Sequence, residues 1–146
     1  MEKKKHTVFI SGAITPIFIA DSIAKHSSKT SIGGHNIFLG QVRNDVIDGK
    51  MVVAIDYSAY EEMAEQKFNE IREAAFAKYE IICMHIYHSL GMVKTGEISL
   101  FVFTSSAHRK EAIEACTYLV NRIKEEVPVW GKEVFEDESY VWKKNT

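Results

Sequence analysis

The sequence contains little cysteine and little proline. Two cysteines, Cys83 and Cys116, are too few for a disulfide framework or a four-ligand zinc site. Both lie in apolar runs, so we expect two buried free thiols in a reduced, cytoplasmic protein. Two prolines and eight glycines leave little room for long flexible linkers. At 146 residues, the chain is therefore expected to form one domain spanning residues 1–146.

An excess of charge of one sign is also missing. Lys and Arg number 18 and Asp and Glu number 20, so the formal net charge is −2. This balance argues against a broad basic surface for duplex nucleic acid. The basic N-terminal residues precede an apolar stretch that Ser11, Gly12 and Pro16 interrupt and Asp21 follows. We therefore expect neither a signal peptide nor a membrane-spanning helix.

Segments with a hydrophobic period of two residues alternate with segments with a helical period of 3.6. Thr15 and Pro16 are typical of an N-cap and a first helical position, and Pro128 is expected to end the last helix. Because hairpins mix with crossover connections, the order indicates an α+β protein with three helices packed on a mixed or antiparallel sheet. The predicted helices are 16–26, 59–79 and 106–126, and the predicted strands are 6–11, 35–43, 50–57, 80–88, 97–103, 129–135 and 140–142.

The start of the last predicted helix has the residues of an anion site. A helix N-terminus carries free N–H groups and a partial positive charge, and His108 and Arg109 add side-chain charge there. Together they indicate a pocket suited to a phosphate. The alternative is a solvated first turn in which Arg109 pairs with an acid at the surface. Ala112 and Ile113, the helical neighbours of Arg109, offer no such partner.

Two lysines, Lys124 and Lys132, lie on either side of a Pro-Val-Trp segment. Lys124 falls at the border of the apolar stripe of the last helix. A lysine beside an apolar wall has a lowered pKa and can act as a base or nucleophile. The alternative is that both are surface lysines, with Trp130 in the core.

The strand expected at residues 35–43 ends in a second candidate anion ligand, Arg43, whose alternative is an exposed loop arginine. Gly40 within that strand indicates close approach by a backbone or a ligand. His85 and His88 are three residues apart in a strand and point to opposite faces, so they do not form a metal-binding pair. A glycine-rich phosphate loop and a Ser-His-Asp order are missing.

Taken together, these segments resemble the catalytic (large) subunit of molybdopterin synthase from Val8 to Trp142. The resemblance implies an α/β-hammerhead-type fold and a homodimer in which each subunit binds one small ubiquitin-like sulfur-carrier subunit, giving a heterotetramer. It implies sulfur transfer from the carrier's C-terminal thiocarboxylate to cyclic pyranopterin monophosphate, and this chemistry demands no metal or organic cofactor. The segments that carry the resemblance are Gly34–Arg43, Tyr57–Ala64, Gly96–Glu97, Ser106–Arg109 and Lys124–Glu133.

The resemblance also implies roles for particular residues. By position, Lys124 matches the principal catalytic lysine and Glu133 matches an acid that follows the lysine pair. The remaining matches are to the substrate pocket: Phe38, Arg43, His108 and Arg109. Arg109 and Lys124 are fifteen residues apart on one helix, about 22 Å along its axis, so a single substrate reaches both only if two subunits share the site.

One position departs from the pattern. The second active-site lysine that relatives carry directly after the tryptophan is Gly131 here. We expect Lys132 to do its work if a β-bulge at Gly131 turns the Lys132 side chain toward the pocket. Alternatively, Lys132 is a surface lysine and Lys124 acts alone. The missing lysine also leaves a rival function open, a non-catalytic adaptor that binds a ubiquitin-like tail through an anion pocket.

Overall fold

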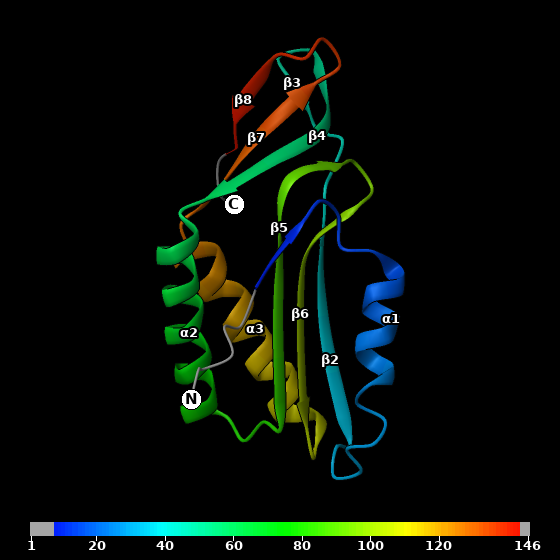
Figure 1. Ribbon diagram of the computed structural model, residues 1–146, viewed down its shortest axis with the longest axis vertical. Coiled ribbons are helices and arrows are strands. Elements are labelled where there is room, and N and C mark those ends of the chain that lie inside the picture. Colours follow the sequence, from blue (N-terminus) through cyan, green and yellow to red (C-terminus); the bar gives the residue numbers. More distant parts are fainter. Residues whose placement is uncertain (1–7, 144–146) are drawn as a thin grey trace.

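Residues 8–143 are described by a computed structural model, and over this range the chain has the predicted α+β architecture (Figure 1). Three helices pack on an eight-stranded, mostly antiparallel sheet. The elements are β1 Phe9–Ser11, α1 Pro16–Ala24, β2 Gly34–Gln41, β3 Val46–Ile47, β4 Lys50–Ala59, α2 Glu61–Lys78, β5 Cys83–Lys94, β6 Ile98–Ser106, α3 Arg109–Glu126, β7 Val129–Phe135 and β8 Tyr140–Trp142. Part of the first predicted strand, residues 6–7, lies outside the described residues.

The central strand β5 joins two parts of the sheet. The strand order is β2-β6-β5-β4-β7-β8, with β1 parallel to β5 and β3 paired with β4. Residues 83–88 of β5 pair with β6, and residues 91–94 pair with β4. Gly91 has a φ of +83° at this change of partner. The predicted end of the strand at His88 was therefore wrong, because Gly91 bends the strand without ending it.

The helices cover opposite faces of the sheet (Figure 1). The buried faces of α2 and α3 pack on β5 and β6 in the main core, where Phe68, Leu119 and Val102 are fully buried. α1 covers the other face, where Phe18 packs edge-on against Tyr87 with ring centroids 4.8 Å apart. α1 begins as predicted, since the Phe18 N–H donates to Oγ1 of Thr15 at 3.2 Å.

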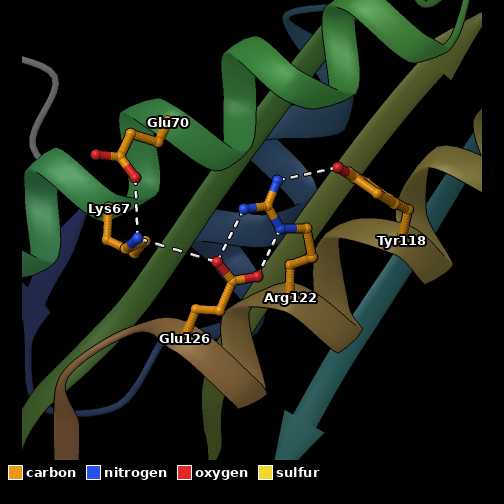
Figure 2. Close-up of polar contacts among 5 residues, drawn as sticks. All are labelled: Lys67, Glu70, Tyr118, Arg122 and Glu126. Carbon is orange, nitrogen blue, oxygen red and sulfur yellow. Dashed lines mark hydrogen bonds and ion pairs between the residues drawn. The ribbon is translucent and has the colours of Figure 1, made fainter.

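A polar cluster joins α2 to the C-terminal half of α3 (Figure 2). The Arg122 guanidinium donates two hydrogen bonds to the Glu126 carboxylate, at 2.6 and 2.8 Å, and a third to the hydroxyl of Tyr118 at 3.0 Å. Lys67 of α2 lies 4.0 Å from the same carboxylate and 2.9 Å from Glu70. The cluster thus fixes the last turns of α3 relative to α2.

No helix in the described part of the chain is both long and apolar enough to cross a membrane.

We expect the Glu126→Gln variant to have a slightly lower Tm than the wild type at pH 7. The hydrogen bonds from Arg122 hold the pKa of Glu126 below its ordinary value. Its charged form therefore stabilises the fold above the ordinary carboxyl pKa, and this contribution is lost as the pH falls through the lowered pKa. Thermal unfolding followed by circular dichroism should show the two Tm curves converging in acid. A constant difference across pH would contradict an ionic origin.

Candidate functional site

Two cavities meet where the C-terminal end of α3 lies against β4 and β7. The smaller has a volume of about 110 Å³, and Leu100, Ile123 and Val127 form an apolar wall that continues into the main core. The larger has a volume of about 260 Å³ and a more polar lining that includes Ser99 and Glu133. The smaller cavity thus combines an apolar wall with charged and polar side chains, and the larger cavity is the more polar of the two.

Lys124 lines both cavities, as its position at the border of the apolar stripe of α3 predicts. Its side chain is solvent-accessible, yet the surrounding protein desolvates the ammonium group and lowers its pKa. The positive charges of Lys143 and Arg43 lower the pKa further. Lys124 therefore releases its proton more easily than an ordinary surface lysine.

Phe38 and Arg43 reach the larger cavity from β2 and the loop that follows it. Arg43 is exposed and forms an ion pair with Asp45 at 3.2 Å. Gly40 lies between them in sequence, and a Cβ placed there would approach the Cβ of Leu100 to 3.2 Å. The nearest group to Gly40 is therefore the side chain of Leu100, and not the backbone or ligand that was predicted.

Glu133 and Tyr57 form the polar floor of the larger cavity. Glu133 is 8% exposed, and its Oε2 atom is buried without a hydrogen-bond partner in the described structure. The Tyr57 hydroxyl donates to Oγ of Ser99 at 3.1 Å. Burial raises the pKa of Tyr57, the Ser99 hydrogen bond lowers it, and the Glu133 charge adds to the increase. A buried carboxylate oxygen with no partner is costly, so it marks a place for a ligand's N–H or O–H group.

His88 lines the smaller cavity, which the sequence analysis did not foresee. Burial lowers its pKa to about 4, the Ser89 hydrogen bond opposes the decrease, and the charge of Lys124 adds to it. The contact from Nδ1 to the Ser89 carbonyl is 2.8 Å long, and a carbonyl only accepts, so Nδ1 carries the hydrogen. His85 faces α1 instead, with its Nε2 3.0 Å from Nε2 of His26, as the strand alternation predicts.

The described residues hold no group of three or more His, Cys, Asp or Glu side chains suited to a metal ion.

His108 and Arg109 lie at the other end of α3 and line neither cavity. His108 occupies the N-cap position without a side-chain cap, and Arg109 is exposed. The predicted helix start at Ser106 was three residues early, because Ser106 ends β6. Its Oγ still accepts the Ala112 N–H at 3.0 Å. Within one chain, Arg109 and Lys124 therefore lie at opposite ends of α3 and do not line the same cavity.

Lys132 also lies away from the cavities, and the bulge predicted at Gly131 is not present. Around Gly131 the pairing of β7 with β4 is regular, with Gly131 opposite Tyr57 and Lys132 opposite Asp56, and the register shift of this ladder lies between Val52 and Ala54. The Lys132 side chain therefore takes the opposite face, where Nζ lies 4.6 Å from the ring centre of Tyr140. Trp130 is 46% exposed and is not a core residue.

We expect His88 to stay neutral at pH 6, because its pKa of about 4 lies below the ordinary value of 6.5. Between these two values the unfolded chain binds more protons than the folded one, so stability should fall as the pH decreases from 6.5 toward 4. Nitrogen NMR should show the neutral, Nδ1-protonated tautomer at pH 6, and the imidazolium only as the pH approaches 4. An imidazolium signal for His88 at pH 6 would contradict the assignment.

Comparison with known proteins identifies the family of the chain. The family model described as "MoaE protein" matches residues 14–126, more than half of the chain. The molybdopterin synthase catalytic subunit of Pyrococcus abyssi is 41% identical over 124 residues, which cover 85% of this chain and 82% of that protein.

Two solved structures share the fold. The crystal structure of molybdopterin synthase from Staphylococcus aureus superposes with a TM-score of 0.80 at 30% identity, covering 93% of this chain and 95% of that one. A complex of subunits 1 and 2 of molybdopterin-converting factor from Helicobacter pylori superposes with a TM-score of 0.79 at 20% identity, covering 93% and 88%. The chain therefore belongs to the MoaE family of molybdopterin synthase catalytic subunits, and its activity is that of a sulfurtransferase.

Proposed function

We propose that the two cavities around Lys124 are the site where sulfur passes from the C-terminal thiocarboxylate of a small ubiquitin-like carrier to cyclic pyranopterin monophosphate. The observation that carries this proposal is a lysine with a lowered pKa at the point that the two cavities share. One cavity accommodates the reacting end of the carrier, and the other accommodates the pterin. The group that exchanges the proton then lies between the two substrates.

The chemistry needs a nucleophilic sulfur, a displaced oxygen and a proton. The thiocarboxylate sulfur forms a C–S bond to a substrate carbon as that carbon's bond to oxygen breaks, which leaves a thioester between carrier and substrate. Water then hydrolyses the acyl C–S bond of this thioester, so the carrier leaves as its carboxylate and the sulfur stays on the substrate. The Lys124 ammonium gives a proton to the departing oxygen, and nearby positive charge stabilises the developing anions. A lysine whose pKa is lowered gives up this proton at less cost, and the apolar wall of the smaller cavity limits competing water.

The larger cavity fits a ligand that is anionic at one end and carries hydrogen-bond donors at the other. Arg43 at the rim supplies positive charge for a cyclic phosphate. The Glu133 carboxylate, with its unpaired Oε2, matches the N–H groups of a pterin ring. Phe38 offers an aromatic surface beside them. A phosphorylated pterin has these features together.

A second copy of the chain and a carrier subunit complete the proposed assembly. Because Arg109 and Lys124 lie at opposite ends of α3, a two-fold homodimer supplies His108 and Arg109 to the site of the other subunit. The Helicobacter pylori complex of two molybdopterin-converting factor subunits supports binding of a small carrier subunit. With one carrier on each catalytic subunit, the assembly is a cytoplasmic heterotetramer.

We expect the Lys124→Ala variant to lose on the order of 10²-fold or more in the rate of sulfur transfer, because it removes both the proton donor and a positive charge. The measurement is single-turnover product formation from thiocarboxylated carrier and cyclic pyranopterin monophosphate. Lys110→Ala is the matched control, since Lys110 is an exposed lysine on the same helix. A wild-type rate in the Lys124 variant would refute the proposed site.

Mixing two inactive variants tests the shared site. Arg109→Ala and Lys124→Ala homodimers should each be inactive, whereas a mixed dimer contains one site with both residues intact. Subunit exchange should therefore restore up to about half of the activity per mixed dimer. If mass spectrometry confirms exchange and no activity returns, Arg109 and Lys124 do not act in one site formed across the dimer.

A further inference from the structure

Three side chains line both cavities: Tyr57, Lys124 and Lys143. Tyr57 is held by its hydrogen bond to Ser99, and Lys124 is the lysine of the proposed chemistry. Lys143 follows β8 and takes no part in the function proposed above. Lys143 is therefore a second positively charged side chain where the two cavities meet, and its role has still to be assigned.

The β7–β8 ladder fixes the position of Lys143. Trp142 pairs with Lys132, and the Lys143 N–H donates to the Gly131 carbonyl at 2.8 Å, so the ladder continues by one residue. Opposed residues of antiparallel strands share a face. The Lys143 side chain therefore lies on the face of Gly131 and Glu133, which is the cavity face.

Ile55 and Tyr57 fill the space beside Gly131 on this face. A Cβ placed at Gly131 would lie 2.8 Å from Cγ2 of Ile55 and 3.5 Å from the ring of Tyr57. A side chain at position 131 thus requires Ile55 to move, whereas Lys143 reaches the same cavity from the neighbouring strand. Lys132 does not compete for this place, because its ammonium group lies over the rings of Tyr140 and Trp142.

Electrostatics gives independent support for this position. After desolvation, the charge of Lys143 is the largest cause of the lowered pKa of Lys124, ahead of the charge of Arg43. Two ammonium groups that repel each other at one cavity are both stabilised when an anion binds between them. The structure therefore favours an anionic ligand at the point where the cavities meet.

We propose that Lys143 is the second substrate-binding cation of this site and holds the anionic thiocarboxylate end of the carrier beside Lys124. This proposal rests on the proposed function. Lys143 binds the anion, and Lys124 exchanges the proton with the departing oxygen. We assign these two roles from the elements that carry the lysines. Lys124 extends from a helix packed on the core, whereas Lys143 extends from a half-buried chain segment after β8.

The first test compares lysine variants in single-turnover sulfur transfer. Lys143→Ala should reduce the rate by about 10-fold or more, since one charge that stabilises the anion is lost. Lys143→Arg should recover most of that loss because it restores the charge. Lys94→Ala, an exposed lysine at the end of β5, is the matched control. Lys132→Ala tests the alternative that Lys132 is the second cation. A larger loss of rate in Lys132→Ala than in Lys143→Ala would overturn the proposal.

The second test does not depend on activity. Nitrogen NMR of the lysine Nζ groups follows the titration of Lys124 in the wild type, Lys143→Ala and Lys132→Ala proteins. Removing the Lys143 charge should raise the pKa of Lys124, and removing Lys132 should not. An unchanged Lys124 titration in Lys143→Ala would overturn the proposal, as would a raised pKa accompanied by a wild-type rate.

These experiments distinguish failure of the proposed function from failure of the role proposed for Lys143. If Lys124→Ala keeps the wild-type rate, the proposed function fails at its central residue, whatever the Lys143 variants do. If Lys124→Ala is inactive and Lys143→Ala is fully active, the proposed function stands and only the role of Lys143 is lost. Circular dichroism of each variant confirms that the fold is retained in every comparison.

Discussion

The packing of α3 against the sheet is the constraint on which the candidate site depends. Buried residues along the helix, from Ala112 to Ile123, pack it into the main core against β6 and β2, so the helix cannot rotate or slide without opening the core. This packing sets Lys124 at the border of the apolar stripe, where the helix meets the cavities. The cluster around Glu126 ties the same end of the helix to α2. The lysine therefore extends from a helix whose buried face is packed into the main core.

The site separates two kinds of electrostatic environment. The apolar wall of the smaller cavity disfavours charge, lowering the pKa of Lys124 and keeping His88 neutral. The larger cavity holds Arg43 at its rim and a buried carboxylate, Glu133, at its floor. An anionic group and an N–H donor on one ligand satisfy both ends of this cavity.

Much of the fold could be predicted from the sequence because the signals were local. The Thr15 cap, the bounds of β7 and β8, and the helical stripes that place Lys124 all depend on residues close together in the chain. The continuation of β5 past Gly91 could not be predicted in this way, because it depends on pairing with β4, more than thirty residues earlier. In the sequence, a glycine that adopts a positive φ in a turn cannot be distinguished from one that does so at a bend within a strand.

The site was predicted in part for a similar reason. Phe38, Arg43, Lys124 and Glu133 meet at the larger cavity, as the resemblance implies. Lys132 was assigned on its nearness to Gly131 in the sequence, but strand alternation directs it to the opposite face. The residue beside Gly131 in space is Lys143, which the antiparallel ladder brings there from the next strand. Sequence spacing alone does not reveal a neighbour across a ladder.

A crystal structure of the complex with a carrier subunit tests the central claim most directly. The account predicts that the carrier's C-terminal carboxylate, in the place of the thiocarboxylate, lies between the ammonium groups of Lys124 and Lys143 within hydrogen-bond distance. It also predicts that the smaller cavity receives the end of the tail. A carrier tail that ends elsewhere on the chain, with both cavities empty, would contradict the account.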